Sequence, residues 1–252
     1  MLHRILAVAV VAGGLAGIAV TGLQMLWAVP LIHVAETYEN AGAAPANVAS
    51  HTHAAGTPAH SHGTEAGHGH AALTAEPWAP ADGIERTAWT LIANLLIGVG
   101  GGLVLAAVFS LRRRADLTTG LAFGAVAFAA FGLAPALGLP PELPGTAAAE
   151  LGARQAWWAG AAIATIGGLA TAYYGRRLWV KAAGLLLLTL PHLVGAPAPE
   201  IHGALAPAAL QREFIAASLV NSAVFWIVLG GLTGWLTRRL PDLQTETAGE
   251  PA

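Results

Sequence analysis

The run ILAVAVVAGGLAGIAVTGLQMLWA, residues 5–28, decides the fold class of this chain. It carries no charged side chain and exceeds the roughly 20 apolar residues that a helix needs to cross the hydrocarbon core of a bilayer. The basic flank Met1–Arg4 resembles the start of a signal peptide, but the run is longer than a signal core and shows no clear cleavage site. We therefore expect a retained first transmembrane helix, stopped by Pro30.

The composition of the whole chain is that of a polytopic membrane protein. Of its 252 residues, 55% are apolar and 10% charged, and the mean hydropathy is +0.60. Soluble domains carry about 25% charged residues. A net charge of −2 gives no case for nucleic-acid binding. The absence of cysteine excludes disulfides, thiolate metal sites and cysteine nucleophiles.

Five further apolar runs follow the first one, and they predict an all-α bundle of six transmembrane spans. The weakest contains Lys181, Pro191 and His192, and without it the bundle would have five spans. The five runs are residues 87–111, 118–139, 156–174, 178–196 and 214–236. The chain then divides into a first span (1–28), an extracytoplasmic loop (29–87), a bundle of four or five spans (88–236) and a cytoplasmic tail (237–252).

The placement of basic residues favours six spans. Lysine and arginine in short loops accumulate on the cytoplasmic side of a membrane. With a cytoplasmic N-terminus and six spans, only Arg86, Arg154 and Arg212 lie outside, whereas five spans would also place Arg238 and Arg239 outside. We therefore expect both termini in the cytoplasm. Nine of the twelve basic residues would then face the inside: Arg4, Arg112, Arg113, Arg114, Arg176, Arg177, Lys181, Arg238 and Arg239.

The extracytoplasmic loop is rich in histidine, and its middle has a composition that predicts disorder. Residues 51–70 read HTHAAGTPAHSHGTEAGHGH and hold six of the ten histidines, in three His-x-His pairs. Residues two apart in an extended segment project to the same side, so each pair can offer two imidazoles to one ion. The predicted ligands are His51, His53, His60, His62, His68 and His70.

These pairs indicate capture of a divalent transition-metal ion, because imidazole suits zinc, nickel, copper and cobalt-like ions. Glu65 could add an oxygen ligand. Ligation requires neutral imidazole, so capture should weaken as the pH falls through about 6.5. The alternative interpretation is a repetitive Ala/Gly/His linker that binds metal incidentally.

Selectivity would require ionisable groups close to the bundle, where such groups are costly and tend to be functional. The candidates are His33, Glu36 and Glu39 after the first span, Glu142 after the third and His192 beside Pro191. On a helix, His33 and Glu36 would share a face, with Glu39 nearly opposite. Each could instead be an ordinary water-facing side chain at the interface.

Enzymatic motifs are absent from the sequence. It contains no G-x-S-x-G, no H-E-x-x-H and no phosphate-binding loop, so we expect neither catalysis nor a tightly bound cofactor. The pairs Gly13/Gly17, Gly98/Gly102 and Gly230/Gly234 have the G-x-x-x-G spacing of closely packed membrane helices, which predicts a tight bundle.

Several stretches together resemble the CbtA family. They are AETYE (35–39), DGIERT (82–87), LAPALGLPPELPG (133–145), ARQAWW (153–158) and PHLVGAPAP (191–199), with the histidine loop after the first span. The resemblance covers essentially the whole chain. It implies a cobalt transporter subunit of the bacterial cell membrane, associated with cobalamin synthesis. It also implies a partner, CbtB, a small single-span protein with its own histidines, and five spans instead of six.

The sequence therefore predicts a lipid-embedded subunit that imports a divalent metal ion, cobalt by resemblance, as cargo. A homo-oligomer is compatible with this prediction. Two alternatives remain open: a nickel or zinc transporter of the same architecture, or a non-transporting membrane protein that senses metal or delivers it to a partner.

Overall fold

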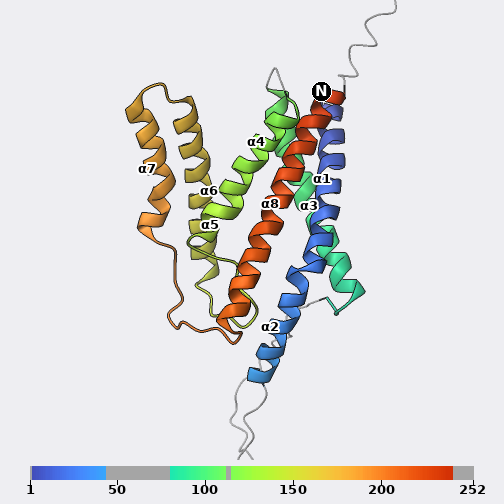
Figure 1. Ribbon diagram of the computed structural model, residues 1–252, viewed down its shortest axis with the longest axis vertical. Coiled ribbons are helices and arrows are strands. Elements are labelled where there is room, and N and C mark those ends of the chain that lie inside the picture. Colours follow the sequence, from blue (N-terminus) through green and yellow to red (C-terminus); the bar gives the residue numbers. More distant parts are fainter. Residues whose placement is uncertain (1, 44–79, 112–114, 241–252) are drawn as a thin grey trace, which may run out of the picture.

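The computed structural model describes residues 2–43, 80–111 and 115–240, and this part of the chain is almost entirely helical, without a named strand. Figure 1 shows a helical bundle with a hairpin, α6–α7, along one side. The elements are α1 (Leu2–Leu26), α2 (Ala28–Ala43), α3 (Ile84–Ser110), α4 (Leu117–Phe128), the π-helix η1 (Ala129–Leu133), α5 (Ala134–Ala136), α6 (Leu151–Tyr174), α7 (Leu178–Val194) and α8 (Ala208–Arg239).

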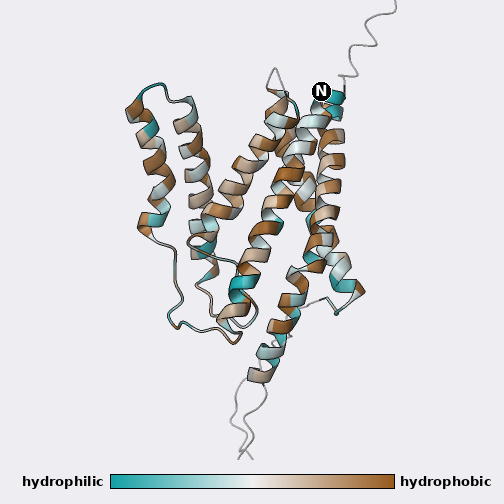
Figure 2. Cartoon of the chain, viewed as in Figure 1, coloured by the Kyte–Doolittle hydropathy of each residue, from teal (hydrophilic) through white to brown (hydrophobic). Residues whose placement is uncertain are grey.

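Four helical segments are long and apolar enough to cross a membrane. They are Leu2–Leu26, Ile84–Ser110, Leu117–Ala136 and Ala208–Arg239. Hydrophobic residues predominate along the helices (Figure 2). The chain is thus a multi-pass membrane protein, as its composition predicts. Helix α7 has 17 residues, about 26 Å of helix against a hydrocarbon core of about 30 Å.

Six helices alternate in direction. Helices α1, α4 and α7 descend in Figure 1, and α3, α6 and α8 ascend. The first and last helices therefore meet at one end, where the Arg4 guanidinium donates a hydrogen bond to the backbone carbonyl of Thr237. We call this the Arg4 end, and the opposite end, where α2 lies, the His33 end. The alternation accommodates six crossings, although α6 and α7 are not among the four strongest candidates.

The predicted stop at Pro30 is wrong. Only Trp27 separates α1 from α2, and α2 carries the helix on from Ala28 to Ala43. Pro30 lies in the first turn of α2, where a proline is tolerated because the N–H it lacks would have no partner within the helix. Residues 29–43, expected in a loop, are thus helical and place His33, Glu36 and Glu39 beyond the first span.

Glycines bring the helices into contact at their backbones, as the G-x-x-x-G spacing predicts. A Cβ at Gly13 of α1 would lie 2.3 Å from the carbonyl carbon of Gly98 in α3. A Cβ at Gly230 of α8 would lie 2.4 Å from the carbonyl oxygen of Gly120 in α4. Such distances leave no room for a side chain. These crossings fasten α1 to α3 and α4 to α8.

The main core lies on the Arg4 side of these helices. Phe109 and Leu229 are 1% and 0% exposed, and they pack with Ala12 and Ala16 of α1 and with Phe225. Buried hydroxyls of Thr233 and Thr237 donate to backbone carbonyls one turn earlier, so they add no unpaired polar group. This half of the bundle is closely packed.

Two proline-rich segments lie at the His33 end of the helices in the second half of the chain. Residues 139–150 and 195–207 meet in an isolated antiparallel bridge between Thr146 and Ala204. Gln211 of α8 donates to the carbonyl of Pro141 at 2.7 Å and accepts from the backbone N–H of Leu143 at 3.2 Å. The carbonyl left free by the prolines therefore finds a partner.

Candidate metal-binding site

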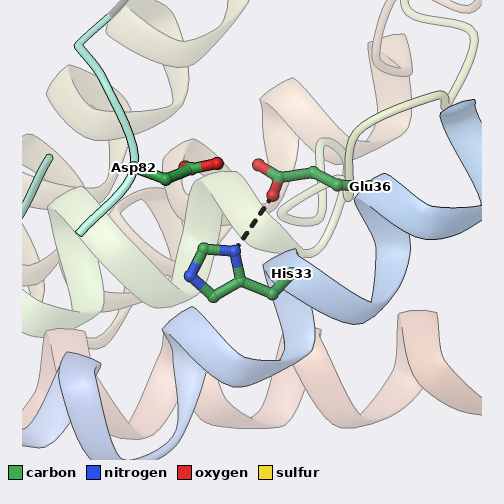
Figure 3. Close-up of side chains that lie close together, drawn as sticks. All are labelled: His33, Glu36 and Asp82. Carbon is green, nitrogen blue, oxygen red and sulfur yellow. Dashed lines mark hydrogen bonds and ion pairs between the residues drawn. The ribbon is translucent and has the colours of Figure 1, made fainter.

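Three potential metal ligands come together at the His33 end. His33 and Glu36 lie one turn apart on α2, and Asp82 lies in the turn before α3 (Figure 3). One ligand atom from each lies within 4.8 Å of the others, and Nδ1 of His33 is 3.1 Å from Oε2 of Glu36. Gly83, with a φ of 92°, turns the chain from Asp82 into α3, a conformation that favours glycine. We call His33, Glu36 and Asp82 the triad.

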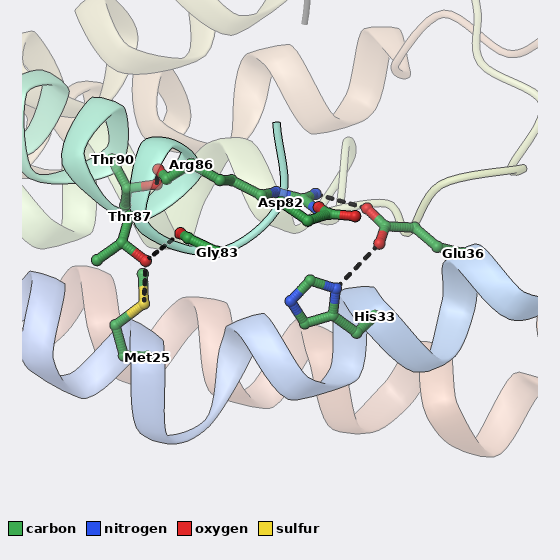
Figure 4. A network of polar contacts seen from close by, with 8 residues as sticks. All are labelled: Met25, His33, Glu36, Asp82, Gly83, Arg86, Thr87 and Thr90. Atoms are coloured by element: carbon green, nitrogen blue, oxygen red, sulfur yellow. Dashed lines mark hydrogen bonds and ion pairs between the residues drawn. The ribbon is translucent and has the colours of Figure 1, made fainter. Parts of the chain in front are cut away.

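Arg86 supplies the positive charge that the triad faces. One of its terminal nitrogens donates to Glu36 at 2.5 Å and the other to Asp82 at 3.0 Å (Figure 4). The hydrogen bond from Arg86, foremost, and then that from His33 lower the pKa of Glu36, against the opposing effect of partial burial. Glu36 therefore stays ionised at pH values below those at which an ordinary glutamate takes up a proton. As a carboxylate it remains a competent metal ligand.

The neighbouring contacts fix the start of α3 against α1. The hydroxyl of Thr87 donates to the carbonyl of Gly83 at 2.9 Å and lies 3.8 Å from the sulfur of Met25 (Figure 4). Thr90 donates to the carbonyl of Arg86. Because Arg86 is held at the start of α3 and Glu36 on α2, their ion pair joins two helices through residues that are 50 positions apart in sequence.

The donor set suits a borderline divalent cation. One imidazole nitrogen and two carboxylate groups are ligands that zinc, nickel and cobalt-like ions accept, whereas a soft ion prefers sulfur. A metal ion at the triad would take over the charge-balancing position that Arg86 holds. Because the guanidinium already pairs with both carboxylates, a metal ion would have to compete with it for them.

One member of the triad, His33, lines a cavity, as does the neighbouring Arg86. His33 and Arg86 line a space of about 840 Å³ between α1, α2, α3 and α8, which reaches Phe225 and Gly101 in the bundle interior. A second space, of about 680 Å³, lies between α5, α6 and α8. The two share lining residues, which are Phe131, Trp158, Ser218 and Ser222.

The structure separates the other predicted ligands from the triad. Glu39 is exposed on α2, outside the triad. Glu142 pairs with Arg154 at 3.1 Å, and the His192 ring packs edge-on against Trp157 with centroids 5.8 Å apart. The six histidines of the loop lie outside the described residues: His51, His53, His60, His62, His68 and His70.

Sequence reasoning grouped His33 with Glu36 and missed Asp82 and Arg86. The contact between His33 and Glu36 follows from their spacing and is confirmed. Asp82 and Arg86 form an i, i+4 ion pair, visible as a pattern in DGIERT. Nothing in the pattern could say that this pair meets α2, because the histidine-rich segment separates them in sequence.

Comparison with known proteins places the chain in a family. The family model described as "Probable cobalt transporter subunit (CbtA)" matches residues 2–238, nearly the whole chain. No curated protein and no solved structure matches it significantly. A multi-pass helical bundle with nitrogen and oxygen ligands at a cavity mouth agrees with a metal-transport role. The chain belongs to the CbtA family of probable cobalt transporter subunits.

Proposed function

We propose that this protein imports a divalent transition-metal ion, with cobalt as its cargo for cobalamin synthesis. The observation that carries the proposal is the position of the triad, His33, Glu36 and Asp82, beside the cavity between α1, α3 and α8, which His33 lines. In this proposal, the three side chains bind the ion before it enters the bundle. The family match supports cobalt as the metal.

The shape of the bundle supports access from the His33 end. The cavity extends from His33 to Phe225, and beyond Phe225 the side chains of Phe109 and Leu229 are buried in the core. The contact of Gly13 with Gly98 holds α1 against α3 beside the cavity. An importer in this conformation would receive metal at the His33 end and release it after the Arg4 end opens.

Charge supports the assignment of the His33 end to the outside. The Arg4 end is rich in arginine, as a cytoplasmic face is; it carries Arg4, Arg176, Arg177, Arg238 and Arg239. In this orientation both termini are cytoplasmic, six helices cross the inner membrane, and the histidine-rich segment 51–70 collects metal outside. A CbtB-like single-span subunit would be the partner, with a homo-oligomer as a further form of assembly.

The decisive experiment measures radioactive cobalt accumulation in cells that express the protein with a CbtB-like partner. We expect His33→Ala, Glu36→Gln and Asp82→Asn to raise the half-saturating cobalt concentration at least about tenfold, the lower end of what losing even an outer partner of a metal site costs. Glu39→Gln, on the same helix but outside the triad, is the matched control and should accumulate cobalt normally.

The alternatives give different results. Uptake that nickel or zinc suppresses more effectively than unlabelled cobalt would assign the transport to that metal. Cobalt binding to the purified protein without accumulation in cells would favour a sensor or delivery protein. Triad variants that match Glu39→Gln would show that the triad is not on the path of the ion.

A further inference from the structure

Asn221 lies at the inner part of the cavity, on the face of α8 that the cavity exposes. Ser218, Asn221, Ser222 and Phe225 all line the cavity, with the i, i+3, i+4 and i+7 spacing of one helical face. Ala217, the neighbour of Ser218 on another face, is fully buried, and Val220 is 42% exposed. The polar side chains of this segment are therefore gathered on the cavity side.

The amide oxygen of Asn221 has no hydrogen-bond partner among the described residues. The residue is only 3% exposed, and its Oδ1 is buried. An unsatisfied buried polar group costs about 1–3 kcal/mol, and a water molecule or an ion is one partner that can offset this cost. Because Asn221 lines the cavity, such a partner would sit in the cavity.

The opposite wall holds a second amide in a fixed orientation. Nδ2 of Asn94, on α3, donates to Oγ1 of Thr21 at 2.9 Å and to Oε1 of Gln24 at 2.7 Å. Both amide hydrogens of Asn94 are thereby committed, which leaves its carbonyl oxygen as the group that it can offer to the cavity. The inner cavity is thus lined by hydrogen-bond acceptors from both α3 and α8.

The inner cavity is neutral and aromatic. Among the described lining residues, only His33 and Arg86 ionise, and both lie at the mouth. Phe131 stacks between Trp158 and Trp226, with ring centroids 6.0 and 5.2 Å away, and these rings help to form the wall. Aromatic faces attract cations. Neutral oxygens alone, however, cannot replace the water shell of a bare divalent ion at membrane depth.

We propose that the inner cavity binds a hydrated divalent cation, held through its water shell by Asn221, Asn94, Ser218 and Ser222. The inference rests on the proposed function. It adds a second binding site, which the ion would reach after the triad. The outward hydrogens of a metal-aqua ion are donors, and the cavity offers acceptors to match them. Six waters occupy roughly 180 Å³ at about 30 Å³ each, which the cavity accommodates.

The absence of cysteine from the chain makes a direct test feasible. Ser222→Cys is introduced into the full-length protein, and intact cells are treated with a charged, membrane-impermeant thiol reagent, with and without cobalt. We expect labelling, because a cavity that holds a hydrated ion must contain water and open to the outside. We expect cobalt to slow the labelling, by about tenfold at roughly ten times its dissociation constant. Ala217→Cys and Val220→Cys, buried and outside the cavity lining respectively, should remain unlabelled.

The role of Asn221 is tested in the same background. Asn221→Leu removes the acceptor and should abolish protection by cobalt, while the thiol introduced by Ser222→Cys stays reactive. Asn221→Asp keeps an oxygen and serves as the second variant if the leucine protein does not fold. Failure of Ser222→Cys to react, or protection that persists in Asn221→Leu, would overturn the inference. Protection without cobalt accumulation in cells would instead overturn import and leave the cavity site standing.

Discussion

Arg86 is the residue with which a metal ion at the triad would compete. It bridges Glu36 and Asp82, and its side chain is 32% exposed. Without a metal ion, the two carboxylates would place like charges within 4.8 Å of each other. The arginine between them neutralises this charge. The same charge opposes the arrival of a second cation. Metal affinity and the stability of the empty site are therefore coupled through one side chain.

Arg86→Gln should tighten metal binding. Partly exposed ion pairs are worth up to about 1 kcal/mol, so removal of the competing guanidinium should lower the dissociation constant for cobalt by up to about fivefold. Isothermal titration of the purified protein measures the change. Arg154→Gln, which breaks the Glu142 pair away from the triad, is the control and should leave the constant unchanged. Weaker binding in Arg86→Gln would show that Arg86 is needed to assemble the triad.

The ion pair also predicts how stability depends on pH. The pKa of Glu36 is lowered in the folded protein, so its carboxylate stabilises the fold above the ordinary glutamate value of 4.5, and this contribution is lost as the pH falls through the lower, folded value. Thermal unfolding in detergent should therefore show Glu36→Gln less stable than the wild type at pH 7. The difference should vanish in strong acid. A difference that persists there would exclude the charge of Glu36 as its origin.

At the scale of elements, α1 and α3 meet both through their backbones and through side chains. The backbones of α1 and α3 touch at Gly13 and Gly98 and again at Gly17 and Asn94, where the side chains of Asn94 and Gln24 add a hydrogen bond. The π-helix between α4 and α5 carries Phe131, which both cavities share. Such π-turns frequently occur at functional sites. The polar contacts of Asn94 and the π-turn therefore lie beside the cavity, and the glycine contacts hold α1 and α3 together along the same stretch.

Gly98→Ala should therefore destabilise the bundle. A Cβ at Gly98 would lie 2.2 Å from the carbonyl oxygen of Gly13, a backbone atom that cannot yield, and overpacking of this kind costs about 1–3 kcal/mol. Gly100→Ala, on the same helix, meets nothing within 4 Å and is the matched control. Thermal unfolding in detergent compares the two variants. If the two variants were equally stable, α1 and α3 would be able to move apart at Gly98 at little cost, and the contact would not hold them together.

At the scale of the whole molecule, the sequence predicted what depends on local composition and missed what depends on contacts across the chain. Apolar length predicted the helices, and glycine spacing predicted the crossings near Gly13 and Gly230. Pro30 misled the prediction, because a proline ends a helix only when it lies past the first turn. Asn221 gave no signal at all. A single asparagine in an apolar run acquires meaning only when the fold places it beside a cavity.

The six-span topology puts the loops on either side of α7 on opposite faces of the membrane. If α6 and α7 both cross, residues 195–207 lie outside and residues 175–177 inside, with the end of α8 inside as well. Reporter fusions after Arg177, Gly203 and Leu240 should then report cytoplasm, outside and cytoplasm. The fusion after Leu240 decides the number of spans. An outside location there would give the five crossings that the family resemblance implies, and would leave Arg238 and Arg239 on the outer face against the positive-inside tendency.

The histidine-rich segment 51–70 lies in the chain between the two helices that form the triad, and this connection predicts what its deletion does. We expect its imidazoles to raise the local concentration of metal beside His33 without selecting one metal ion over another. Deletion should therefore raise the half-saturating cobalt concentration and leave maximal uptake unchanged, measured as accumulation over a range of cobalt concentrations. Replacement by an equally long Gly/Ser segment separates loss of histidine from loss of length. If maximal uptake fell with the replacement, the segment would take part in translocation itself, and the triad alone would not be the gateway to the cavity.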